Sequence, residues 1–211
     1  MLTRKEAAWL ACKEKTCCYD AVVIPTGRDV WRIARTLDTP LQSFLLYFPT
    51  AQPRRDAFLL DHSGQAFRLA LGKATGGRRR SSPPCIFLLR TRSGHHRCGL
   101  GDLRPLVCRA LHADLVDGVL TLANDGRCAC RNWTLADVDI AEEGALVRAR
   151  QRDAEEYCDI VARWNRGVTS APAGTSFTFG DYCAYLLGTY DTLAAQAEAG
   201  GSETREEALV A

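Results

Sequence analysis

Residues 134–166 read TLADVDIAEEGALVRARQRDAEEYCDIVARWNR, and this stretch decides the fold class. Its apolar residues Tyr157, Ile160, Val161 and Trp164 recur at the spacing of one helix face. A second helix is predicted over 181–199, DYCAYLLGTYDTLAAQAEA. The C-terminal third of the chain is therefore expected to be helical, and the protein α-rich.

Two of the ten cysteines fall on these predicted helices. Cys158 adjoins Tyr157 and Cys183 adjoins Tyr182, both on apolar stripes. A free cysteine on such a stripe behaves as a small buried hydrophobe. We expect this packing role for both.

Shorter elements precede the helices. Residues 3–11 are predicted to be a helix and 21–25 a strand. Thr26 and Asp29 indicate the start of a further helix, which Pro40 ends, and 41–48 are expected to be helical as well.

The rest of the N-terminal part suggests a small antiparallel β element. Residues 57–61 and 65–71 flank a turn and indicate a hairpin, and CIFLLR at 85–90 is strand-like. The sequence thus predicts an α-rich α+β fold with loop-borne cysteines. We expect a cysteine-cluster domain over 1–133, a helical extension packed on it over 134–199, and a flexible tail over 200–211.

Composition narrows the possible functions. The chain has 211 residues, 46% of them hydrophobic and 25% charged, with a net charge of +2. Such a balance does not favour nucleic acid or a membrane surface as a partner. The N-terminus lacks a secretory signal, so we expect a cytoplasmic protein, in a compartment that keeps thiols reduced.

The other eight cysteines lie in loops or at strand edges: Cys12, Cys17, Cys18, Cys85, Cys98, Cys108, Cys128 and Cys130. Loops let side chains converge without fixed helix or strand geometry, and zinc and iron–sulfur centres each use about four thiolates. The spacing matches neither a zinc ribbon with two C-x₂-C pairs nor the C-x₂-C-x₂-C run of bacterial ferredoxins. Clustered thiols in a reducing compartment nevertheless favour metal or redox chemistry over disulfides.

Several motifs in this region resemble a known family. CKEKTCC at 12–18 is followed by PTGRDVWRIAR at 25–35, then by Cys85-Ile86-Phe87-Leu88 and by Cys98 and Arg104-Pro105 before Cys108-Arg109. This order resembles the YkgJ-type cysteine cluster family, described as a zinc- or iron-chelating domain, over about residues 9–112. The resemblance implies metal ligands at Cys12, Cys17, Cys18, Cys85, Cys98 and Cys108.

The chain also departs from that family. Many members carry a further upstream cysteine, where this chain has Trp9, and an aromatic residue with proline after the final Cys-Arg, where it has 110–112, Ala-Leu-His. Cys128, Cys130 or His112 can replace the missing ligand. Arg104 and Arg109 are expected to offset the negative charge of bound thiolates, the alternative being that both are solvated surface charges.

These observations support a protein that holds zinc, iron or a [4Fe–4S] cluster through loop thiolates. A first alternative is an iron–sulfur enzyme or electron-transfer partner, and a second is a metal-free thiol redox sensor. Beyond the metal or cluster itself, a protein partner is conceivable but no motif identifies it. The chain shows no Ser-His-Asp signature, HExxH helix or phosphate-binding loop.

Overall fold

The computed structural model describes residues 4–12, 15–52, 54–74, 83–92, 96–110, 112–123 and 133–210, with side chains up to residue 199. Its helices are α1 (Arg4–Ala11), α2 (Thr16–Tyr19), α3 (Gly27–Leu37), α4 (Leu106–Arg109), α5 (Ile140–Ser170) and α6 (Phe179–Val210). Single 3₁₀ turns lie at Leu41–Ser43, Gly101–Leu103 and Leu135–Asp137. The predicted α-rich α+β class is confirmed.

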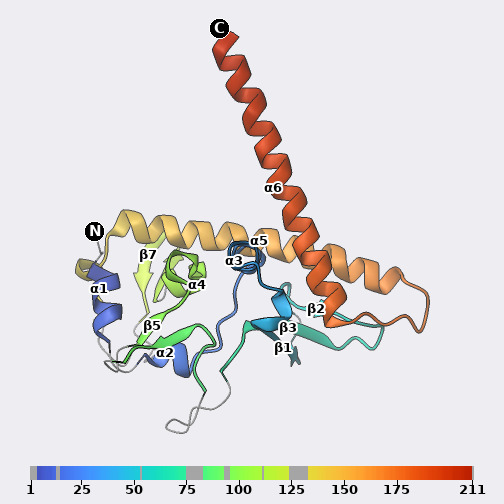
Figure 1. Ribbon diagram of the computed structural model, residues 1–211, viewed down its shortest axis with the longest axis horizontal. Helices are drawn as coiled ribbons and strands as arrows, with labels where there is room; N and C mark the ends of the chain where they lie inside the picture. Colours follow the sequence, from blue (N-terminus) through green and yellow to red (C-terminus); the bar gives the residue numbers. More distant parts are fainter. Residues whose placement is uncertain are drawn as a thin grey trace.

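The described strands form three small antiparallel sheets. β1 (Leu45–Thr50), β3 (Ala66–Leu71) and β2 (Phe58–Leu59) make one sheet in that order. β4 (Leu88–Arg90) pairs with β5 (His96–Cys98), and β6 (Ala113–Val116) pairs with β7 (Val119–Leu122). Helix α5 runs along one side of the molecule and contacts α3, α4, β2 and β6 (Figure 1).

Helix α3 begins where the sequence predicts. The Thr26 hydroxyl accepts a hydrogen bond from the backbone N–H of Asp29, and the Asp29 carboxylate accepts one from the backbone N–H of Thr26, at 3.2 and 3.1 Å. This reciprocal capping box satisfies two of the backbone donors that a helix start leaves free. Val30 and Ile33 on the same helix are fully buried.

Two predicted elements were wrong. Residues 41–48 do not form a helix, because β1 starts at Leu45 and pairs with β3 in the register Leu45↔Leu71. There Tyr47 lies against Phe67 and Phe179, with ring centroids 5.3 and 4.5 Å away, so packing overrides local propensity. Residues 21–25 form no strand; that segment is extended, and its Val23 carbonyl accepts a hydrogen bond from the Leu71 N–H.

One core joins the N-terminal part to the C-terminal helices. Phe58 of β2 stacks on Tyr182 of α6 with centroids 3.9 Å apart, and the Tyr182 and Tyr157 hydroxyls are hydrogen-bonded at 2.9 Å. The indole N–H of Trp164 donates to the Leu59 carbonyl at 2.7 Å. The helices that we expected as an extension therefore share the core of the cysteine-bearing part.

Helix α6 continues through Val210, past the boundary at 199 that the sequence suggested. Its last turns contain Glu, Ala and Leu, which are strong helix formers, and they follow the glycine pair at 200–201. The C-terminal half of α6 projects away from the rest of the protein (Figure 1). Within the described residues, no helix combines the length and hydropathy that crossing a bilayer requires.

Candidate thiol-lined metal site

Five cysteines from four separate segments line one cavity of about 90 Å³, which we call the thiol cavity. They are Cys17 and Cys18 of α2, Cys85 before β4, Cys98 at the end of β5, and Cys108 of α4. Trp9, Arg104, Pro105 and Val107 complete much of its wall. The structure thus brings together two parts of the chain that lie about 70 to 90 positions apart, as the sequence predicted.

Backbone hydrogen bonds fix the α2 segment against Cys85. The Cys85 N–H donates to the Cys18 carbonyl at 2.7 Å. The Lys73 ammonium donates to the carbonyls of Tyr19 and Ala21, each at 2.8 Å, so it holds the chain directly after the vicinal cysteines. Lys73 also forms an isolated β-bridge with Cys85.

Cys98 and Cys108 approach from the other side. Cys98 pairs with Leu88 in the β4–β5 ladder, which fixes its strand relative to Cys85. Pro105 is the N-cap residue of the short helix α4, and its carbonyl accepts a hydrogen bond from the Cys108 N–H at 2.8 Å. A proline at this place costs nothing, since the first helical N–H groups have no partner within the helix.

The vicinal pair is electrostatically asymmetric. The sulfur atoms of Cys17 and Cys18 lie 3.9 Å apart. A hydrogen bond from the Cys18 thiol, the indole N–H of Trp9 and the nearby Lys15 ammonium lower the pKa of Cys17 to about 7. The same interaction with Cys17, together with burial, raises the pKa of Cys18. Cys17 is therefore the thiol of this pair that ionises first.

The other three thiols of the cavity are held neutral. Burial is the main reason that the pKa values of Cys85, Cys98 and Cys108 are raised, and the proximity of the other sulfur atoms adds to it. Backbone N–H groups of Phe87 and Leu100 oppose this by hydrogen bonding to Cys85 and Cys98. Such N–H groups stabilise thiolates once a metal has displaced the protons.

Trp9 occupies the place where the family resemblance led us to look for another cysteine. The Lys15 ammonium lies 3.8 Å from the Trp9 ring centroid and donates to the Trp9 carbonyl. The Arg104 guanidinium lies 5.2 Å from the same ring and 3.5 Å from Glu6. Lys15 is fully buried. The Trp9 ring therefore binds two cations, Lys15 and Arg104, beside the thiols.

The remaining predicted ligands lie elsewhere. Cys12 is disulfide-bonded, so its sulfur offers no thiolate in this structure, and it does not line the thiol cavity. Cys128 and Cys130 lie outside the described residues. His112 adopts a φ of 72° and its ring lies 6.2 Å from that of Trp133, away from the residues that line the cavity.

The two predicted charge-compensating arginines differ. Arg104 lines the thiol cavity, and its positive charge opposes the rise in the pKa of Cys98 that burial causes. Arg109 does not line it, and its backbone carbonyl accepts a hydrogen bond from Lys5 at 2.6 Å. The sequence did not predict that Lys73 would donate hydrogen bonds to the carbonyls of Tyr19 and Ala21, because nothing near Lys73 in the sequence indicates which carbonyls it contacts.

The helix-borne cysteines behave differently from one another. Cys183 is 2% exposed within the core, as predicted, and burial raises its pKa to about 12. Cys158 is only half-buried and lines two surface hollows, so its expected packing role was wrong. It lies at the edge of the α5 stripe, beside exposed Asp159, where the core no longer covers it.

Among the described residues, no three Cys, His, Asp or Glu side chains are grouped closely enough to hold a metal ion as they stand. Binding would thus draw the thiols inward from the cavity wall. No protein-family model matches the chain, and searches of curated proteins and of solved structures find no match either.

Proposed function

We propose that the thiol cavity binds zinc or an iron–sulfur cluster through cysteine thiolates. The observation that carries this proposal is the convergence of five cysteines, from segments far apart in sequence, on one small cavity. Packing alone gives no reason to collect so many thiols around a hollow. Cys17, Cys85, Cys98 and Cys108 supply the four thiolates that either centre uses, and Cys18 is a fifth donor.

The surroundings suit a negatively charged centre. Four thiolates around a zinc ion leave a net charge of about −2. Lys15 and Arg104 lie on the Trp9 ring beside the thiols, and Lys73 lies next to Cys85. These cations supply the compensation that a buried anionic centre needs. The motif resemblance to the YkgJ-type family agrees with this proposal, and we propose membership as a divergent relative.

We also propose that the centre takes part in electron transfer or in an enzymatic reaction. We further propose a cytoplasmic location. The seven free cysteines among the described residues suit a reducing compartment, whereas the disulfide at Cys12 does not.

Metal-free redox sensing is the second candidate, favoured by one observation. Cys17 has a pKa of about 7 and lies 3.9 Å from the sulfur of Cys18. A thiolate populated at neutral pH beside a second thiol is the arrangement that redox-sensing cysteines use.

Anaerobic purification separates the two candidates. The metal proposal predicts either iron with acid-labile sulfide and absorbance near about 400 nm, or stoichiometric zinc without colour. Protein that folds normally but contains neither metal would contradict it and favour the redox candidate.

A further inference from the structure

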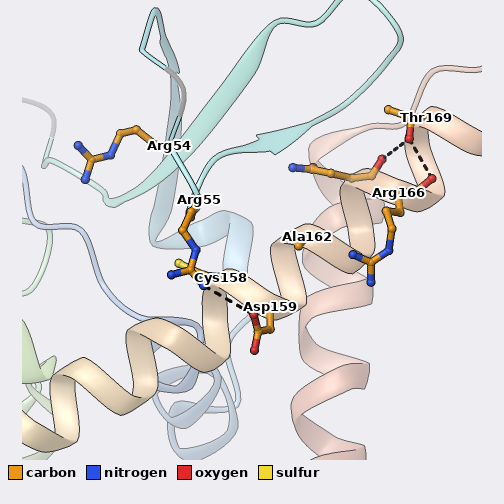
Figure 2. Close-up of a pocket in the computed structure, with 8 residues that line it drawn as sticks. Arg54, Arg55, Cys158, Asp159, Ala162, Arg166 and Thr169 are labelled. Carbon is orange, nitrogen blue, oxygen red and sulfur yellow. Dashed lines mark hydrogen bonds and ion pairs between the residues drawn. The ribbon is translucent and has the colours of Figure 1, made fainter.

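Two adjacent surface hollows lie on the side of α5 that carries Cys158. The first, of about 410 Å³, is lined by Arg54, Arg55, Asp159 and Arg166 among others (Figure 2). The second, of about 520 Å³, is also lined by Arg54 and Arg55, together with Arg68 and Arg150. Because they share Arg54, Arg55 and Cys158, we treat them as one feature, the arginine groove.

Arginine side chains are concentrated in this groove. Five arginines and two aspartates line it, and no lysine or glutamate does, in a chain whose net charge is only +2. The Asp56 carboxylate forms ion pairs with two arginines. It lies 3.2 Å from the Arg54 guanidinium and also pairs with Arg68. Two acids outside the lining pair with groove arginines as well: Asp114 lies 3.0 Å from Arg150, and Glu155 lies 3.1 Å from Arg55. Five guanidiniums thus face four carboxylates, which leaves a small excess of positive charge.

The Arg55 guanidinium can exchange its partners readily. It lies 3.1 Å from Glu155 and 3.8 Å from Asp159, and all three side chains are at least two-thirds exposed. Exposed pairs of this kind contribute little stability because water screens them. Figure 2 shows Arg55 reaching over Cys158 toward Asp159, while Arg54 leaves the same loop in a different direction.

Part of the wall of the second hollow is apolar. Ile24, Pro25, Val107 and Tyr157 contribute to it. Val107 also lines the thiol cavity and adjoins Cys108, so the two features share one wall residue. Hollows of this volume lie within the range of about 300–1,000 Å³ that small-molecule sites occupy.

We propose that the arginine groove binds a small phosphate monoester, with its phosphate among the guanidiniums and its apolar body against the wall that contains Val107. Arginine offers paired N–H donors that match two phosphate oxygens at once, and a dianion can engage more than one guanidinium. Asp159, one of the two aspartates that line the groove, weakens binding by competing for Arg55. The proposal does not depend on a metal in the thiol cavity.

Calorimetric titration of the full chain with phenyl phosphate at low ionic strength tests this site. We expect saturable binding, weakened about tenfold or more in the double variant Arg54→Gln/Arg55→Gln, because the variant removes two guanidiniums that donate charge-assisted hydrogen bonds to the phosphate. Asp159→Asn should bind more tightly, which unfolding cannot imitate. Arg152→Gln/Arg163→Gln removes the same charge from exposed α5 positions that do not line the groove, and should bind as the wild type does.

Three results would overturn the proposal: no saturable binding up to about 10 mM phenyl phosphate, equal weakening in the two double variants, or unchanged affinity in Arg54→Gln/Arg55→Gln. Equal weakening would show that the protein attracts anions through its overall charge alone.

Discussion

The Asp29 carboxylate accepts a hydrogen bond from the backbone N–H of Leu106 at 3.1 Å. Asp29 belongs to the first turn of α3, and Leu106 opens α4, which carries Cys108. The second carboxylate oxygen of Asp29 caps α3 through the Thr26 N–H. One buried side chain thus both starts a helix and positions a wall of the thiol cavity.

Asp29→Asn tests this double role. Asparagine has the same shape but only one acceptor oxygen, so one of the two backbone N–H groups loses its partner. We expect the free energy of unfolding to fall by about 1–3 kcal/mol, measured by urea denaturation. Asp38→Asn is the matched control, because exposed Asp38 ends the same helix in a left-handed conformation that asparagine tolerates. Equal stability of Asp29→Asn and wild type would remove Asp29 from this role.

Gly27 marks a close approach between α3 and two tyrosines. A Cβ at this position would lie 2.5 Å from Tyr190 Cε2 and 2.7 Å from Tyr157 Cδ2. Both rings are buried and cannot move aside freely, so Gly27→Ala should destabilise the protein by about 1–3 kcal/mol. Thermal unfolding provides the measurement.

The control substitution for Gly27→Ala is expected to change the stability of the protein in the opposite direction. Gly167 lies within α5, and nothing lies within 4 Å of a Cβ built there. Gly167→Ala should stabilise the protein by about 0.4–1 kcal/mol, because alanine restricts the unfolded chain. Similar effects of both substitutions on the melting temperature would show that the Tyr157 and Tyr190 rings do not constrain Gly27.

The reactivity of Cys17 should depend on pH around neutrality. Thiolates react and thiols do not, so alkylation of Cys17 in metal-free protein should reach half its maximal rate near its pKa of about 7. Peptide-mapped alkylation resolves each cysteine. Cys183, with a pKa raised to about 12, should stay unmodified over the same range and is the internal control.

Lys15→Met should move this profile to higher pH. Methionine keeps much of the volume of the buried lysine but removes the positive charge that favours the Cys17 thiolate. The control is Lys5→Met, which removes a lysine that pairs with Glu143 on α5. A Cys17 profile unchanged by Lys15→Met would show that Lys15 does not stabilise this thiolate.

The sequence was sufficient for much of the fold. The caps at Thr26 and Asp29 and the helical stripe around Ile160 are local signals, and α3 and α5 formed as predicted. It failed at 41–48, where the apolar run LLYF suits a helix as well as a strand. Only pairing with β3, more than 15 residues downstream, decides the outcome.

The thiol cavity could be predicted only in part. Cysteine type and motif order indicated that the CKEKTCC segment and the Cys85 to Cys108 segment belong together. They did not indicate that Trp9 would hold Lys15 and Arg104. The arginine groove escaped prediction because Arg54, Arg150 and Arg166 come from a loop and from distant turns of α5, with no common motif.

The central claim is that the thiol cavity holds a metal centre, and anaerobic quantification of zinc, iron and sulfide in cysteine variants tests it most directly. We predict that Cys17→Ser, Cys85→Ser, Cys98→Ser and Cys108→Ser each lose most of the bound metal and stability, since binding and folding are coupled. Cys158→Ser, outside the cavity, should keep the wild-type content. Full metal occupancy in any two of the four cavity variants would contradict the account.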